Sequence, residues 1–98
     1  MLEKWQTILG LQSWNIKTSG VHVDQIDYNG ENYFIAIERN FIEKEATIYH
    51  DIELDEESIV HELLHIVYPE QEEDETFAEY ESVIDLLSKI KIQNERRK

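Results

Sequence analysis

The sequence predicts an α+β fold: an N-terminal helix, a small and mostly antiparallel sheet, and two C-terminal helices, the second long and rich in glutamate. Three observations support this order. Apolar residues recur at helical spacing near the N-terminus and again after Ser58. Between these segments, β-branched and aromatic residues alternate with polar ones. Pro69, the only proline, separates the two C-terminal helical patterns. We expect residues 1–98 to form one domain.

The first half of the chain contains the predicted first helix and the strands. Leu2, Trp5 and Ile8 share one face of a helix that is expected to end near Gly10. Asn29-Gly30 is a typical hairpin turn that leads into the following strand. A short strand or a connector is expected at residues 15–19, and strands are expected at residues 21–24, 33–37 and 46–52.

Two helices are predicted after the sheet. Asp55 is the candidate N-cap of the first, which Pro69 is expected to end. The second is expected to run from about residue 72 to residue 92. The apolar residues predicted to line its core-facing side are Phe77, Tyr80, Val83, Ile84, Leu87 and Ile90.

The first of these helices carries the pattern H-E-x-x-H, as His61-Glu62-Leu63-Leu64-His65. Two histidines four residues apart share one helix face, so both imidazoles can reach one cation. Glu62 is displaced around the helix, which suits a base that deprotonates a metal-held water. The pattern therefore indicates hydrolysis of a peptide bond assisted by one Zn²⁺ per chain.

A zinc site for hydrolysis needs a third protein ligand and leaves its fourth position to water. If residues 69–71 form a tight connection, residues symmetric about position 70 lie at similar heights on the two helices. Glu75 then faces His65, and Glu79 faces His61. We predict Glu75 as third ligand and Glu79 as the acceptor that orients His61, with the swapped assignment left open.

The H-E-x-x-H pattern is followed by Glu75-Thr76-Phe77-Ala78-Glu79. Together the two segments resemble the gluzincin metallopeptidases, which have H-E-x-x-H on one helix and E-x-x-x-D/E on the next. The short chain is most similar to the minigluzincins, soluble minimal scaffolds that resemble the catalytic cores of membrane-embedded zinc peptidases. This resemblance implies a single minimal metallopeptidase-like domain over residues 1–98. It also implies that His61, His65 and Glu75 bind zinc and that Glu62 is the general base and acid. Glu79 would then contact a ligand without binding the zinc itself.

Substrate contacts are expected on two elements. The resemblance implies that residues 46–52 form an edge strand whose unpaired backbone groups hold an extended peptide. Tyr68 and Tyr80 adjoin the proposed metal and are candidate donors to an oxyanion, and His50 is a candidate substrate contact, although packing is the alternative for each.

Charge and composition limit the function classes. The net charge of −13 disfavours nucleic-acid binding, because an acidic surface repels phosphate. The absence of cysteine, of a signal-peptide pattern and of a long apolar run predicts a soluble cytoplasmic protein without membrane insertion. Five of the nine basic residues lie in the tail at 89–98. This tail either is a frayed helix end or folds over an acidic cleft and makes the protein a latent zymogen.

Three functions remain open on the sequence. The first is a zinc endopeptidase acting on peptides or proteins. The second is a non-catalytic module that zinc stabilises and that binds peptides. The third is a metal-free interaction protein whose acidic surface meets a basic partner. The sequence also leaves open whether the chain forms a homodimer.

Overall fold

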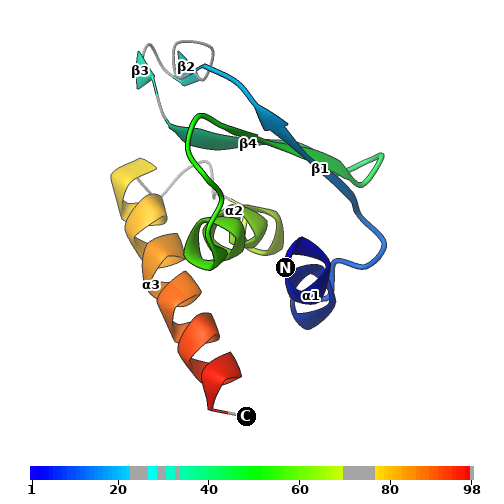
Figure 1. The fold of residues 1–98 in the computed structure, drawn as a ribbon, viewed down its shortest axis with the longest axis vertical. Helices are drawn as coiled ribbons and strands as arrows, with labels where there is room; N and C mark the ends of the chain where they lie inside the picture. The colour runs from blue at the N-terminus through cyan, green and yellow to red at the C-terminus, as the bar shows by residue number, and fades with distance from the viewer. Residues whose placement is uncertain (23–26, 29–30, 33, 70–76, 98) are drawn as a thin grey trace. The chain divides into compact units, whose positions relative to one another are not determined.

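The computed structural model describes residues 1–22, 27–28, 31–32, 34–69 and 77–97. It confirms the predicted α+β fold, with a helix, a small sheet and then two helices of which the last is long (Figure 1). The chain divides into two compact units. A helical unit contains Met1–Leu9 and Asp55–Lys98, and a sheet unit contains Gly10–Leu54.

The sheet unit is built on three strands, in the order β1-β5-β4. β5 pairs in parallel with β1 and antiparallel with β4, so the sheet is mixed. β2 and β3 form a separate antiparallel pair around the predicted Asn29-Gly30 turn, which lies outside the described residues. The bounds of the strands are β1 (Asn15–Gly20), β2 (Asp27–Tyr28), β3 (Glu31–Asn32), β4 (Ile35–Asn40) and β5 (Glu45–His50).

Two strand predictions need correction. A strand was predicted at residues 21–24, but the strand observed is β1. Val21 and His22 follow β1 in non-strand conformation. The expectation of an edge strand at residues 46–52 is wrong, because β5 is the central strand. Ala46, for example, pairs with Ile16 on one side and Arg39 on the other. The backbone of β5 is therefore already paired on both sides and cannot add a substrate strand.

The helical unit consists of α1 (Leu2–Ile8), α2 (Glu56–Val67) and α3 (Phe77–Arg96). α2 lies between the other two and contacts both (Figure 1). Its apolar residues fill the centre of the unit because they cover most of its circumference. Among the described residues of this unit, the buried apolar ones are Trp5, Ile59, Val60, Leu63, Leu64, Ile66, Tyr80, Ile84 and Ile92.

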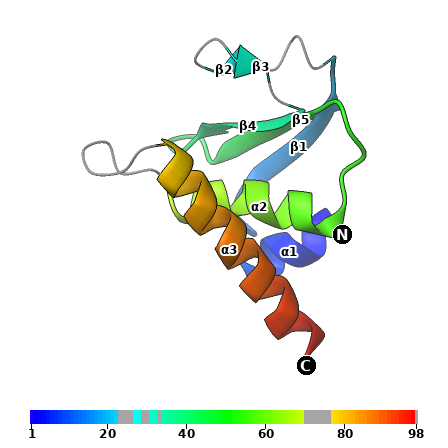
Figure 2. The same ribbon diagram turned by 90° about the vertical axis from the view of Figure 1, so that its left-hand side faces the viewer.

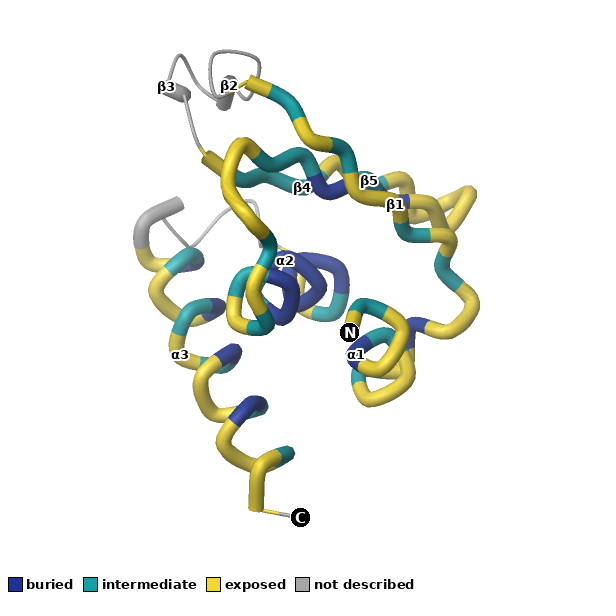
Figure 3. Tube along the Cα trace, in the orientation of Figure 1, coloured by how far each residue is buried: buried dark blue, intermediate teal, exposed yellow. Residues whose placement is uncertain are grey.

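α3 is buried along one face and exposed along the other (Figure 3). The predicted core stripe is wrong at Val83 and Ile90, whose exposed fractions are 51% and 41%. Apolar residues recur on more than one face of this helix, so their spacing does not decide which face is covered. Among residues 79–96 of this helix, the buried ones lie four apart and are Tyr80, Ile84, Ser88 and Ile92. The side chain of Phe77, also predicted for the core stripe, lies outside the described part.

Glu56 joins the start of α2 to the other two helices. Its Oε2 accepts a hydrogen bond from Nε1 of Trp5 at 3.0 Å, and its Oε1 lies 3.5 Å from Nη2 of Arg96. The described part of the basic tail is thus the C-terminal end of α3, packed beside the start of α2. Residue 96 is 15 positions beyond Glu81 on this helix, which corresponds to roughly 22 Å along its axis.

Asp55 caps the N-terminus of α2, as predicted. Its Oδ1 accepts a hydrogen bond from the backbone N–H of Ser58 at 2.8 Å, one of the donors that a helix leaves without an internal partner. We expect Asp55→Ala to lower the free energy of unfolding by about 1 kcal/mol in denaturant titrations. Asp55→Asn should cost less, because the amide oxygen can accept the same hydrogen bond.

The same contact makes stability depend on pH. The hydrogen bond from the Ser58 amide lowers the pKa of Asp55 below its ordinary value. The stabilisation by the charged carboxylate is therefore fully present above the pKa of the unfolded chain, about 4, and is lost as pH falls through the lower pKa of the folded state. Wild type should exceed Asp55→Asn in stability at pH 7, and the two should converge in acid. A difference that is constant across pH would contradict this assignment.

Candidate metal centre

α2 presents two imidazoles on one face. The ring centroids of His61 and His65 are 5.1 Å apart, as expected for residues one helical turn apart. Asp55 starts the helix, and Tyr68 ends it with φ −124° and ψ 78° because Pro69 follows. His65 is buried and His61 is half-buried, so both rings are held in place by their surroundings.

Glu81 of α3 lies against both rings. α3 runs beside α2 in the helical unit (Figure 2). Oε2 of Glu81 lies 3.0 Å from Nε2 of His61, and Oε1 lies 2.9 Å from Nε2 of His65. Among the described residues, His61, His65 and Glu81 are the one group of histidines and acids that could hold a metal ion, with ligand atoms within 4.8 Å of one another.

The three donors suit a small divalent cation. Two imidazole nitrogens and one carboxylate oxygen are a usual ligand set for such an ion. In a tetrahedral zinc site the ligand atoms lie roughly 3.4 Å apart. The 3.0 Å contact to His61 and the 2.9 Å contact to His65 involve different oxygens of Glu81. One ligand atom from each of the three residues lies within 4.8 Å of the others, so the His-His-Glu group could hold a metal ion.

The charges of the group are strongly coupled. Burial alone would raise the pKa of Glu81, but hydrogen bonds with His61 and His65 and their charges lower this pKa to about 2. Burial alone would lower the pKa of His61. The hydrogen bond to Glu81 and the nearby negative charges, that of Glu62 included, outweigh burial and raise the pKa of His61. The Glu81 side chain is thus an ionised carboxylate at neutral pH, as a metal ligand must be.

The second nitrogen of each ring also faces α3. Nδ1 of His61 lies 3.9 Å from Oδ1 of Asp85, whose Oδ2 pairs with Nζ of Lys89 at 3.2 Å. Nδ1 of His65 lies 2.9 Å from the hydroxyl oxygen of Tyr80. In metal sites, an acceptor on the second nitrogen fixes the tautomer and the direction of the ring. On α3, Tyr80 is such a partner for His65, whereas Asp85 lies beyond hydrogen-bond distance of His61.

Glu62 has an exposed fraction of only 4%. Its charge contributes to the raised pKa of His61, so the carboxylate acts directly on the His-His-Glu group. Burial of a carboxylate is costly, and a purely structural position in α2 could be filled by an apolar residue at less cost. A buried acid beside possible metal ligands is a candidate for proton transfer.

The hairpin register differs from the predicted one by six positions on α3. His65 meets Glu81 and His61 meets Asp85, so the two helices are symmetric about position 73 rather than 70. Asp85 takes the place that was predicted for Glu79, which is exposed and not part of the His-His-Glu group. Glu75 lies outside the described residues, so its role as ligand stays a prediction.

Sequence reasoning missed Glu81 and Asp85, although a signal for them existed. After His65 the pattern E-x-x-x-D/E occurs at residues 70 and 74, at 75 and 79, and at 81 and 85. The third occurrence is the one adjacent to Tyr80 and Ile84, which are buried. The pair at residues 81 and 85 could have been chosen by requiring two acids four residues apart on a helix face that borders the core.

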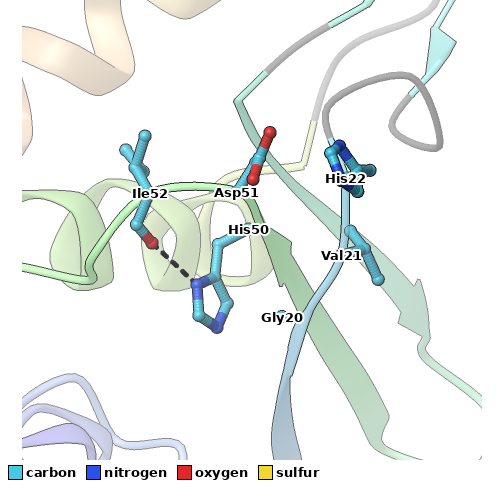
Figure 4. Close-up of a pocket in the computed structure, with 6 residues that line it drawn as sticks. All are labelled: Gly20, Val21, His22, His50, Asp51 and Ile52. Atoms are coloured by element: carbon cyan, nitrogen blue, oxygen red, sulfur yellow. Dashed lines mark hydrogen bonds between the residues drawn. The ribbon is translucent and has the colours of Figure 1, made fainter.

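The three predicted substrate contacts have different surroundings. The Tyr68 side chain is exposed by 44%, while Tyr80 is buried and its hydroxyl contacts other groups of the helical unit. His50 belongs to the sheet unit, where its Nδ1 donates to the backbone oxygen of Ile52 at 2.8 Å. Figure 4 shows its ring turned away from the side chains of His22 and Asp51. The pocket there is lined by Gly20, Val21, His22, His50, Asp51 and Ile52.

Comparison with known proteins identifies no relative. No protein-family model, curated protein or solved structure matches the chain. Within the described parts of the chain, no helix is long and apolar enough to cross a membrane. A function therefore has to be argued from the geometry of the His-His-Glu group.

Proposed function

We propose that the chain is a zinc-dependent endopeptidase in which His61, His65 and Glu81 bind the metal. The observation that carries the proposal is that a carboxylate from α3 completes the pair of imidazoles on α2, with the ligand atoms within 4.8 Å of one another. H-E-x-x-H alone supplies two ligands, whereas hydrolysis by zinc needs three and an open fourth position. The resemblance of H-E-x-x-H to the gluzincin pattern supports the same activity, although that resemblance implies Glu75 and not Glu81 as the third ligand.

Zinc is the metal we propose, with one ion per chain. Two neutral imidazoles and one carboxylate with an open position suit zinc better than softer or harder ions. When bound, zinc lowers the pKa of a coordinated water toward neutrality and polarises the carbonyl to be attacked. Nε2 of His61, Nε2 of His65 and one oxygen of Glu81 are the atoms that would hold it.

Glu62 is proposed as the general base and acid. Its carboxylate would accept a proton from the attacking water and then deliver that proton to the amine nitrogen of the leaving group. Asp85, whose Oδ1 lies 3.9 Å from Nδ1 of His61, would need to approach that nitrogen to accept a hydrogen bond and keep the ring in place. The proposed substrate is a peptide or protein, because H-E-x-x-H is typical of metallopeptidases. The net charge of −13 disfavours polyanionic substrates.

A second candidate is a zinc-stabilised module without catalysis. One observation favours it: Glu81 joins α2 to α3 through ion pairs with both histidines. A cation shared by the three residues would hold the same two helices together, and such binding contributes directly to folding stability. This candidate needs no role for Glu62.

Metal analysis together with a cleavage assay tests the proposal. The purified chain would be loaded with zinc, dialysed, analysed for metal and incubated with a reduced, unfolded polypeptide. We expect one zinc per chain and cleavage that stops with a chelator and returns with added zinc. Stoichiometric zinc without cleavage would favour the non-catalytic module. No bound zinc would contradict both metal-dependent functions and favour a metal-free interaction protein.

A further inference from the structure

Two consecutive residues of α3 hold the two nitrogens of a single imidazole. Oε1 of Glu81 lies 2.9 Å from Nε2 of His65, and the hydroxyl of Tyr80 lies 2.9 Å from Nδ1 of the same ring. The rings of His65 and Tyr80 are also in edge contact, with centroids 5.1 Å apart. The Tyr80 contact is buried, since that residue is exposed by only 5%.

The proton of the Tyr80 hydroxyl is used in a hydrogen bond to the backbone. This hydroxyl donates to the backbone oxygen of Tyr68 at 2.7 Å. Tyr68 is the C-cap of α2, and a carbonyl at the end of a helix has no donor within that helix. The short contact to Tyr80 therefore satisfies a carbonyl group that would otherwise need another partner.

The direction of the second hydrogen bond follows from the first. A tyrosine hydroxyl has one proton. Because this proton goes to the Tyr68 carbonyl, the phenolic oxygen can only accept from His65. Nδ1 of His65 therefore carries a proton and donates it to Tyr80. Nε2, which here donates to Glu81 at 2.9 Å, is the nitrogen that would bind a cation on release of its proton.

We infer that Tyr80 is a positioning residue that holds His65 in its Nδ1–H form and directs Nε2 to the metal. The inference deepens the proposed function and rests on it for the effect on metal affinity. The protonation of Nδ1 is independent of that function. Tyr80 is thus not available as a donor to an oxyanion, because its hydroxyl is buried and its proton is used within the helical unit.

Tyr80→Phe removes the acceptor and keeps the ring that packs in the core. The Nδ1–H of His65 then loses the phenolic oxygen that accepts its hydrogen bond in a buried place. We expect zinc affinity, measured by competition with a chromophoric chelator, to fall by about 10-fold to 100-fold. Tyr68→Phe is the matched control, because Tyr68 contributes its backbone carbonyl, which the substitution retains. Its zinc affinity should equal that of the wild type.

Nitrogen-15 spectra of the histidine rings supply a readout that packing alone would not change. In the wild type without added metal, we expect Nδ1 of His65 to be protonated and its proton to be protected from exchange with water. In Tyr80→Phe the ring packing remains but this protected signal should disappear. Tyr68→Phe should keep it.

Three outcomes would overturn the inference. The first is a wild-type spectrum in which Nδ1 of His65 carries no proton, which is decisive even if Tyr80→Phe does not fold. The second is a folded Tyr80→Phe protein that keeps the protected signal. The third is a folded Tyr80→Phe protein that binds zinc as tightly as Tyr68→Phe. If the wild type binds no zinc, the proposed function fails, while the spectrum still decides the role of Tyr80.

Discussion

Glu62→Gln is expected to lower the rate of peptide cleavage by about 10²-fold to 10⁴-fold, the usual contribution of a proton-transfer group. Glutamine has nearly the same shape as glutamate but cannot accept a proton from water at neutral pH. Zinc should stay bound, because Glu62 is not among the residues that could hold the ion. The comparison of turnover with zinc content therefore separates proton transfer from metal binding.

Glu57→Gln is a suitable control for this experiment. Glu57 lies in the first turn of the same helix, and its side chain is exposed, whereas Glu62 is exposed by only 4%. The same chemical change there should leave both turnover and zinc content unchanged. Normal cleavage by folded, zinc-loaded Glu62→Gln would eliminate Glu62 as the base.

The H-E-x-x-H helix could be predicted in full because its signals are local. Asp55 accepts the capping hydrogen bond, and α2 ends at Val67, close to Pro69. The histidines, four residues apart, necessarily share a face of any α-helix. None of these features depends on the packing of distant parts of the chain, so the sequence was sufficient for them.

The sheet and the last helix depend on choices that local patterns leave open. The alternation at Val21 is as strand-like as the sequence of β1, but β1 is the segment that pairs with β5. In α3, Val83 has the right spacing for a core position and is nevertheless exposed by 51%. Long-range pairing selects one segment or one face among several that are locally equivalent.

The acidic member of the His-His-Glu group was the hardest residue to predict for the same reason. Pairs of acids four residues apart occur three times between residues 70 and 85, and each pair would present two carboxylates on one helix face. The choice among them requires the register of α3 against α2. A tight turn at residues 69–71 places Glu75 beside His65, whereas the packing of Tyr80 and Ile84 places Glu81 there.

Glu81→Gln is expected to abolish stoichiometric zinc binding under conditions that saturate the wild type. The neutral amide is a poor ligand for zinc. Zinc affinity should therefore fall by more than the roughly 100-fold that is caused by removing a hydrogen-bond partner of a ligand. Cleavage should disappear together with the metal. Metal analysis after dialysis against a weak chelator measures the effect, and circular dichroism verifies that the helices remain.

Glu79→Gln and Glu75→Gln decide whether the register found here also holds when zinc is bound. Both remove one negative charge from the same acidic segment, so they control for the general effect of charge on cation affinity. Because Glu79 is exposed and outside the His-His-Glu group, Glu79→Gln should retain zinc. If Glu75→Gln loses zinc while Glu81→Gln retains it, Glu75 is the ligand and the contact of Glu81 with the two histidines is only an ion pair. Loss of zinc in Glu81→Gln alone would establish that α3 contributes its ligand one position after Tyr80, on the face that borders the core.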